Sequence, residues 1–210
     1  MNKFKIFTEV DKFYFTNNVI HYSITLFGIL LCSLFKEFNF PIGVKIFSTI
    51  VILNLIYSLY LVLSATSRYE PLKGKIENTI DFEEDRIVIA NKPFLLNNIK
   101  KIEILCYDVK DQWNIIVSRG NFNGQISNGV GNSLKLLLID GTSQEIYFQQ
   151  DNSTQIINIE NLLISYYKKD KLEFRNLTKI LGYEDSDAIE SFRKTITAAN
   201  STHASLRDLN

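Results

Sequence analysis

The chain has few of the side chains on which catalytic and metal sites depend. Its 210 residues include two histidines, two cysteines, three prolines, one methionine and one tryptophan. The histidines are His21, in an apolar run, and His203, close to the C-terminus. HExxH, CxxC and clustered His/Cys spacings are missing. The stretch 71–198 therefore lacks the histidine of a Ser/His/Asp or Cys/His centre, and we predict a non-enzymatic protein without catalytic residues, metal or cofactor.

Net charge is also lacking, because 23 Lys and Arg residues balance 23 Asp and Glu residues. Affinity for nucleic acid comes largely from clustered basic residues, so nucleic acid is not an expected partner. The adjacent carboxylates Glu83, Glu84 and Asp85 are typical of a solvated turn. A cation site would need further oxygen ligands in a suitable loop pattern, and none follows them in the sequence.

Two long segments, residues 13–35 and 46–67, contain no Asp, Glu, Lys or Arg at all. At 1.5 Å per helical residue, either segment is long enough to cross a hydrocarbon core of about 30 Å. Each holds 12 Ile, Leu, Val or Phe residues, which favour insertion by roughly 4–7 kcal/mol. The pattern predicts a transmembrane hairpin with spans at about 16–36 and 45–66. The alternative is a helical hairpin buried in a soluble core.

Basic residues flank the two spans unequally. Six Lys or Arg residues lie outside the pair of spans and two lie in the link; they are Lys3, Lys5, Lys12, Arg68, Lys73 and Lys75 outside, and Lys36 and Lys45 in the link. This bias predicts a multi-pass protein of the inner (cytoplasmic) membrane with both termini in the cytoplasm. The link, with Pro41-Ile42-Gly43 in its middle, is expected to form a tight turn on the other side. A cleaved signal peptide is disfavoured by the bulky residues that end the first span.

Polar residues within the spans are the first candidates for a site. Counted from the turn, Asn54 lies at about the depth of Gly28, where a missing side chain would allow close approach and a hydrogen bond to backbone. The alternative is that Asn54 and His21 line a pore or an oligomer interface, because intramembrane polar groups are often functional. Cys32 in the first span and Cys106 in the distal part are expected to lie too far apart to pair.

The remainder of the chain predicts an α+β domain. Six runs are expected to be strands: 75–81, 86–90, 99–107, 113–118, 134–139 and 144–149. Helices are expected at about 155–169, 174–181 and 186–199. Short strands joined by hairpins favour an antiparallel bent sheet or small barrel over a parallel sheet. We therefore expect a membrane hairpin at 1–70, a β-rich cytosolic domain at 71–198 capped by C-terminal helices, and a disordered tail at 199–210.

Two stretches carry a family resemblance. Behind the spans, GKIENTIDFEEDRIVIANKPFLLNNIKKIEIL gives a strand, an acidic turn, a second strand, a short return and the opening of a third strand. LLLIDGTSQEIYFQQDNSTQIINIENLLISYY gives two strands joined by Asp-Gly, then an amphipathic helix. From Lys75 to about Tyr167 the chain thus resembles bacterial pleckstrin-homology-like (PH-like) domains, many of which follow two hydrophobic spans. The resemblance implies a bent barrel capped by a C-terminal helix, serving as an oligomerisation or protein-binding module.

The segment RGNFNGQISNGVGN, residues 119–132, is longer than a plain hairpin needs. Long loops on rigid sheets often carry recognition, but a mobile connection is the alternative. A P-loop is not supported, because no GK[ST] and no helix follow the glycines. The candidate ligand or partner residues are Arg119 for charge, Phe122 as an apolar anchor, and Asn128, Gly129 and Gly131.

Three functions are compatible with this sequence. The first is a non-enzymatic membrane protein that presents a PH-like domain at the inner face of the bilayer, for recruitment, sensing or regulation through a protein partner or self-association. The second rests on similarity in architecture to the two-span β-barrel effectors of antiphage defence. It is an effector that binds a small ligand such as a cyclic nucleotide, oligomerises and disrupts the membrane. The third is an immunity protein against a membrane-acting toxin.

Overall fold

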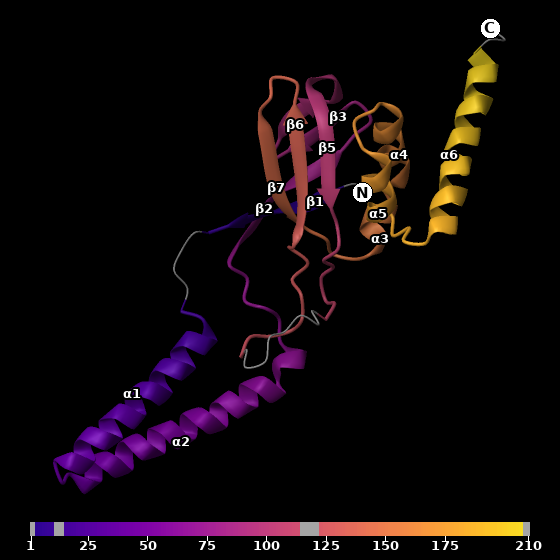
Figure 1. The fold of residues 1–210 in the computed structure, drawn as a ribbon. Helices are drawn as coiled ribbons and strands as arrows, with labels where there is room; N and C mark the ends of the chain where they lie inside the picture. The colour runs from indigo at the N-terminus through magenta and orange to yellow at the C-terminus, as the bar shows by residue number, and fades with distance from the viewer. Residues whose placement is uncertain (1–2, 11–14, 114–121, 208–210) are drawn as a thin grey trace. The chain divides into compact units, whose positions relative to one another are not determined.

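A computed structural model describes residues 3–10, 15–113 and 122–207 (Figure 1). The chain divides into two compact units that alternate along the sequence. The sheet unit takes the described parts of Met1–Thr8, Ile76–Lys110 and Gly129–Asn210, and the hairpin unit takes those of Glu9–Lys75 and Asp111–Asn128. Each unit is described by itself below.

Seven strands in the described part of the chain form one open sheet, in the order β4-β3-β2-β1-β7-β6-β5. They are β1 (Lys3–Glu9), β2 (Gly74–Phe82), β3 (Arg86–Ile89), β4 (Lys92–Leu95), β5 (Ile99–Leu105), β6 (Asn132–Leu138) and β7 (Ser143–Gln149). Antiparallel pairing joins β1 to β7, β2 to β3, β3 to β4, β5 to β6 and β6 to β7. The edges are β4 and β5, so the expected antiparallel α+β sheet is present in its open form.

The strand β1 is the main difference from the sequence expectation, which placed residues 1–70 in the membrane hairpin. Its residues alternate between exposed and buried positions, and Phe4 is fully buried. The Phe4 ring makes edge-on contacts with Phe82 of β2, at 5.6 Å between centroids, and with Phe148 of β7, at 5.2 Å. A central strand therefore precedes the two apolar helices, which are inserted between the neighbouring strands β1 and β2.

The other strands follow the sequence pattern closely, with two differences. Five of the six predicted strands are confirmed as β2, β3, β5, β6 and β7. The predicted strand 113–118 lies outside the described residues except for Trp113. The second difference is β4, where the sequence pattern predicted only a short return between two strands. Pro93 is compatible with this strand because β4 is an edge, where a missing N–H breaks no ladder on its outer side.

Helices cover the sheet and complete its core. They are α3 (Thr154–Ile157), α4 (Glu160–Lys168), α5 (Phe174–Ile180) and α6 (Ser186–Arg207). The predicted helix 155–169 is thus interrupted between α3 and α4. Ile159, Leu163 and Tyr166 are almost fully buried against the strands, as the apolar stripe predicted. The expected tail from residue 199 is instead helical in α6 as far as Arg207.

The edge strand β5 is covered by the chain that follows α4. The Ile102 N–H donates to the Lys171 carbonyl at 2.7 Å, and the Asn176 side chain bonds both the N–H and the carbonyl of Ile104, at 2.9 and 2.7 Å. Asn176 thereby satisfies backbone groups that a further strand would otherwise pair. This edge is closed to strand addition at that point.

The hairpin unit contains α1 (Asn17–Glu37), α2 (Pro41–Leu63) and the short 3-10 helix η1 (Ala65–Ser67). Thr16 caps α1, with its hydroxyl accepting from the Val19 N–H at 3.3 Å. Pro41 begins α2, where a missing N–H breaks no helical bond. The turn is therefore residues 38–40. This corrects the expectation that Pro41-Ile42-Gly43 forms its middle, because all three lie in α2.

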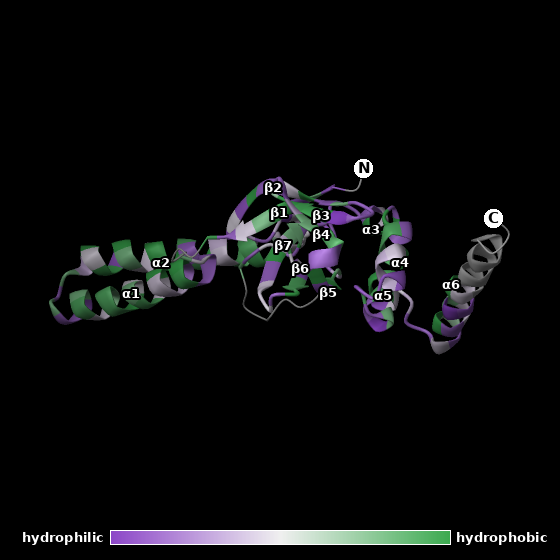
Figure 2. Ribbon diagram, turned by 90° about the horizontal axis from the view of Figure 1, so that it is seen from above, coloured by the Kyte–Doolittle hydropathy of each residue, from purple (hydrophilic) through white to green (hydrophobic). Residues whose placement is uncertain are grey.

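Both helices are long and apolar enough to cross a membrane, and only 11% of the most apolar window of each is buried (Figure 2). A core helix of a soluble protein would be mostly buried. The side chains exposed along the hairpin are largely Leu, Ile, Val, Phe and Tyr. The helices pack closely on each other at Gly28, where a Cβ would overlap the side chain of Val51. This exposure does not fit the alternative of a hairpin buried in a soluble core.

Truncating Phe4 tests whether β1 is an integral strand. Phe4→Ala should lower the free energy of unfolding by about 3–5 kcal/mol, because it leaves a cavity between Phe82 and Phe148. Urea unfolding of the detergent-solubilised full chain, followed by circular dichroism, measures this. Lys5→Ala is the matched control on the exposed face of the same strand, where the ion pair with Asp151 contributes little. Equal effects of the two substitutions would contradict the placement of β1.

Candidate functional site

A buried polar cluster lies between α1 and α2, in the half of the hairpin that is away from the turn at residues 38–40; we call the open end of the hairpin its sheet-side end, because the chain there leads to β1 and β2. His21 and Asn54 are each less than a tenth exposed. The Asn54 side-chain amide donates to the His21 carbonyl at 3.1 Å and to the Thr25 hydroxyl at 2.9 Å. The Asn54 oxygen lies 2.7 Å from His21 Nδ1. Three polar side chains whose burial in hydrocarbon would be costly without partners thus form hydrogen bonds with one another.

This bonding pattern identifies the donor in the contact between His21 and Asn54. Because the Asn54 nitrogen is used as a donor, its oxygen is the acceptor, so His21 Nδ1 must carry the hydrogen. His21 is thereby held in one tautomer and one orientation. Asn54 fixes that orientation from the facing helix.

The predicted partnership of Asn54 with Gly28 is not seen. Gly28 contacts Val51, whereas Asn54 bonds to His21 and Thr25, one to two helical turns nearer the start of α1. A hydrogen bond to backbone does form, as the sequence led us to expect, but to the His21 carbonyl. The polar groups face each other within one chain, and this favours a structural role over a subunit interface or pore lining. Thr25, four residues after His21, was not among the sequence candidates.

A second feature, which we call the clasp, closes the sheet-side end of the hairpin and consists of residues 65–70, 111–113 and 122–128. Its anchor is Phe122, which is buried. The Phe122 ring makes an edge-on contact with His21 at 5.3 Å between centroids and lies 5.5 Å from Tyr22. The Phe122 N–H donates to the Asn18 side chain at 2.8 Å. The sequence predicted Phe122 as an apolar anchor for a ligand or partner. In this structure the Phe122 side chain packs against the hairpin itself.

Arg68 joins the clasp to the end of α2. Its guanidinium donates to the Leu61 carbonyl at 2.6 Å and to the Phe122 carbonyl at 2.9 Å, and its Nε donates to the Ser64 hydroxyl at 3.1 Å. A cation at a helix C-terminus interacts favourably with the helix dipole and satisfies its free carbonyls. Phe122 is thus held through its N–H by α1 and through its carbonyl by the chain after α2. Sequence analysis identified Arg68 only as a flanking charge.

Backbone contacts complete the clasp. The Gln125 N–H donates to the Ala65 carbonyl at 2.9 Å, and Ile126 exchanges bonds with Arg68 and Glu70. Gly124 allows this approach, because a Cβ there would overlap the carbonyls of Arg68 and Tyr69. The Tyr69 hydroxyl donates to the Asp111 carboxylate. That hydrogen bond raises the pKa of Tyr69 above its ordinary value.

The five loop residues predicted from sequence are divided by the structure. Arg119 lies outside the described residues. Phe122 and Asn128 belong to the clasp, where the Asn128 amide donates to the Glu70 carbonyl at 2.7 Å. Gly129 and Gly131 belong to the sheet unit: Gly129 has a positive φ of 69° and its carbonyl accepts from Gln150, and the Gly131 N–H donates to Asp108. Gly129 and Gly131 therefore have local structural roles within the sheet unit.

Cys106 has the surroundings of an inert thiol. Its sulfur donates to the Gln150 side chain at 2.8 Å. Burial, with a smaller contribution from Asp108, raises the pKa of the Cys106 thiol to about 12. The nucleophilic thiolate is therefore scarce at neutral pH. Among residues 3–10, 15–113 and 122–207, no three His, Cys, Asp or Glu side chains are grouped to hold a metal ion.

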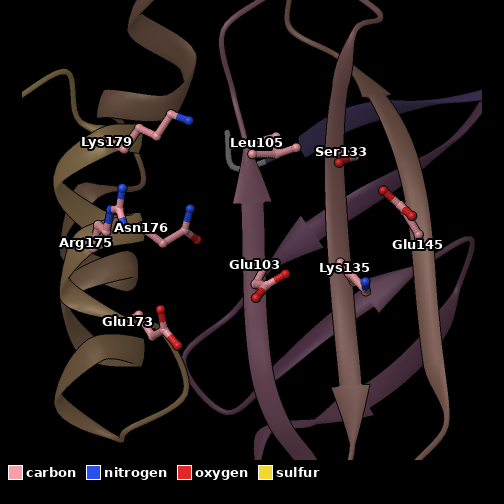
Figure 3. Close-up of a pocket in the computed structure, with 9 residues that line it drawn as sticks. All are labelled: Glu103, Leu105, Ser133, Lys135, Glu145, Glu173, Arg175, Asn176 and Lys179. Carbon is pink, nitrogen blue, oxygen red and sulfur yellow. The ribbon is translucent and has the colours of Figure 1, made fainter.

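A groove of about 390 Å³ lies in the sheet unit between α5 and the outer face of β5, β6 and β7 (Figure 3). It is lined by Glu103, Leu105, Ser133, Lys135, Glu145, Glu173, Arg175, Asn176 and Lys179. Strand register explains the order of the side chains, since Glu103 pairs with Lys135 and Lys135 with Glu145, while Leu105 pairs with Ser133 in the next row. The sequence analysis did not identify this groove, because its two walls come from segments about 70 residues apart.

The charged side chains at the two ends of the groove differ in their ion pairing. Lys101 bonds both Glu103 and Glu173, at 2.7 Å each, and lowers the pKa of Glu103. Arg175 and Lys179, one helical turn apart on α5, have no ion pair within the described part of the chain. One end of the groove therefore presents free cations next to the apolar Leu105 and the hydroxyl of Ser133. Such a surface fits a carboxylate or another anionic group.

Comparisons with protein-family models, with curated proteins and with solved structures found no match to this chain.

Replacing Asn54 tests the polar cluster. Asn54→Leu should destabilise the hairpin by about 0.6–2 kcal/mol, even though leucine is more apolar, because the His21 N–H loses its acceptor and the His21 carbonyl and Thr25 hydroxyl each lose a donor. SDS titration of the protein in bicelles measures the stability, and backbone hydrogen exchange of residues 122–128 should quicken as His21 loosens beneath Phe122. Leu55→Ala, on the exposed face of α2, is the control. Unchanged exchange in Asn54→Leu would refute the coupling of the cluster to the clasp.

Proposed function

We propose that this chain is an integral protein of the inner membrane that holds a PH-like domain at the cytoplasmic face, where the domain binds a protein partner through the groove beside α5. It acts without catalysis, in recruitment, sensing or regulation. The proposal depends most on one observation: two exposed apolar helices leave the sheet after β1 and return to it at β2.

Strand pairing supports the same-side placement of the two hairpin ends. Neighbouring strands β1 and β2 belong to one sheet, so the chain before α1 and the chain after α2 must lie on one side of any membrane that the hairpin enters. The basic residues around the hairpin favour the cytoplasm for that side. These two arguments are independent, because one depends on hydrogen bonds and the other on charge.

The topology supports the PH-like assignment. Strands β1 to β4 run as one meander and β5 to β7 as another, and β1 pairs with β7 to join them. The helices α3 and α4 bury Ile156, Ile159 and Leu163 in the core that the strands share. The sequence resemblance implies a bent barrel capped by a C-terminal helix; the two meanders and the helix packed on them are consistent with it, although the sheet is open at β4 and β5.

The effector function receives less support from the geometry. It requires His21 and Asn54 to meet neighbouring subunits, whereas these side chains are bonded to each other inside one hairpin. An adaptor needs only a stable anchor and an exposed recognition surface. Tethering also raises the effective concentration of the domain for other membrane-bound molecules.

Cysteine labelling tests the membrane placement. In a Cys32→Ser/Cys106→Ser background, single cysteines are introduced at Phe38 in the turn, at Lys5 on β1 and at Glu145 on β7. A membrane-impermeant maleimide should label only Phe38→Cys in spheroplasts, and all three sites after permeabilisation, because the sheet lies inside the cell. Release of the protein from membranes by alkaline carbonate would contradict the spanning hairpin. Labelling of Glu145→Cys in intact spheroplasts would reverse the orientation.

Photocrosslinking tests the groove. A benzoylphenylalanine in place of Leu105 should give a light-dependent protein adduct in cells, and Arg175→Ala/Lys179→Ala should reduce it at least about fivefold by removing the free cations. Lys92→Ala/Lys194→Ala removes the same charge elsewhere and should leave the adduct unchanged. If neither double substitution changes the yield of the adduct, the groove is excluded as the binding surface. Depolarisation of the membrane on overexpression would favour the effector instead.

A further inference from the structure

Three chain segments of the clasp lie side by side just beyond the end of α2. Ile126 forms a parallel bridge with Tyr69 and an antiparallel bridge with Trp113. Residues directly opposite each other on adjacent strands point to the same face. The side chains of Tyr69, Ile126 and Trp113 therefore form one row, with the two aromatic rings on either side of the isoleucine. We call this the Tyr69–Trp113 row.

This row is exposed to an unusual degree for its composition. Trp113 is 65% exposed and Tyr69 is 50% exposed. Trp113 is also the one tryptophan of the whole chain. Tryptophan and tyrosine combine a large apolar body with a polar N–H or O–H, and they gather where one end can be apolar and the other wet. The tyrosine hydroxyl already has such a polar partner in Asp111.

Exposed tyrosines also lie on the hairpin. Tyr57 and Tyr60 on α2 and Tyr22 on α1 are each more than half exposed, and all three lie toward the sheet-side ends of their helices. The backbone of the row is bonded directly to the chain after α2, through the Gln125 N–H to Ala65 and the Ile126 N–H to Arg68. The row therefore lies a few residues beyond the last turn of α2. In a spanning helix that is the level of the lipid headgroups.

Two charged residues of the clasp, Arg68 and Asp111, form hydrogen bonds within it. The Arg68 guanidinium bonds to Leu61, Ser64 and Phe122, and the Asp111 carboxylate accepts from Tyr69. These two charged groups are therefore already hydrogen-bonded partners within the clasp where the aromatic face would approach a bilayer.

Resting on the proposed membrane hairpin, we propose that the Tyr69–Trp113 row is a lipid-contact surface seated in the headgroup layer of the leaflet from which the hairpin enters. The clasp is then a membrane-surface element, and its aromatic row fixes how deep the hairpin lies. Lipid is the occupant because the row lies a few residues beyond the end of α2, in a hairpin that exposes its apolar side chains and carries exposed tyrosines.

The single tryptophan makes the wild-type protein its own probe. The full chain is reconstituted in vesicles of phosphatidylcholine and phosphatidylglycerol at a ratio of about 3:1, and Trp113 fluorescence is measured with nitroxide-labelled lipids. We expect quenching about twofold stronger by a headgroup nitroxide than by one at carbon 12 of the acyl chain, as for an interfacial residue. Iodide in the aqueous phase should quench Trp113 several-fold less than it quenches N-acetyltryptophanamide.

Variants and flotation separate the two proposals. Tyr69→Ser/Ile126→Ser should weaken headgroup quenching, whereas Tyr107→Ser, an exposed tyrosine of the sheet unit, should not change it. If the protein floats with vesicles but Trp113 is quenched fully by iodide and not by labelled lipid, the lipid contact is refuted and the spanning hairpin stands. Protection from iodide without lipid quenching would show a protein contact, and stronger acyl-chain quenching a deeper position; each would overturn the interfacial placement. If the protein does not float, both proposals fail.

Discussion

The pairing of β1 with both β2 and β7 is the constraint on which the rest of this molecule depends. It places Phe4 between Phe82 and Phe148 and makes the N-terminal residues part of the central sheet. The apolar hairpin is consequently an insertion between two hydrogen-bonded strands rather than a leading anchor. Both ends of the hairpin are held by the same domain, so the hairpin cannot cross a membrane an odd number of times without breaking the sheet.

A second level of organisation connects the hairpin to the clasp. Asn54 orients His21, His21 provides a ring surface for Phe122, and Phe122 is held at both its backbone groups by Asn18 and Arg68. Each step is a direct contact between described residues of one compact unit. An event that pulled the clasp away would expose the polar cluster, so the clasp and the helix pair are expected to respond together.

The sequence was sufficient for the elements that have a strong local pattern. Uncharged runs located α1 and α2, alternation located five strands, and the stripe through Ile159, Leu163 and Tyr166 located the helix that closes the core. It missed β1, which has only Phe4 and Ile6 as buried positions and lies next to a longer apolar run. It also missed β4, because Pro93 is typical of a turn as much as of an edge strand.

The site was less accessible to sequence reasoning because its contacts join distant segments. His21, Asn54 and Phe122 were all selected as candidates, yet the contacts of His21 with Asn54 and with Phe122 span 33 and 101 residues of sequence and follow from no local spacing. Arg68 was counted as a charge, but its role as a helix cap depends on where the Phe122 carbonyl lies. The groove beside α5 is set by strand register and by the Asn176 clamp on β5.

The position of β1 also has a consequence for biosynthesis. Lys5 pairs with Gln149, so β1 gains its β7 neighbour only after a partner 144 residues later in the chain has been made, whereas its other neighbour, β2, is made earlier. At translation rates of about 5–20 residues per second, that wait is roughly 7–30 s. The apolar helices leave the ribosome during this interval, before the sheet can close. The pairing of β1 with β7 is therefore a late step of folding, and that edge of β1 is exposed to proteases until β7 emerges.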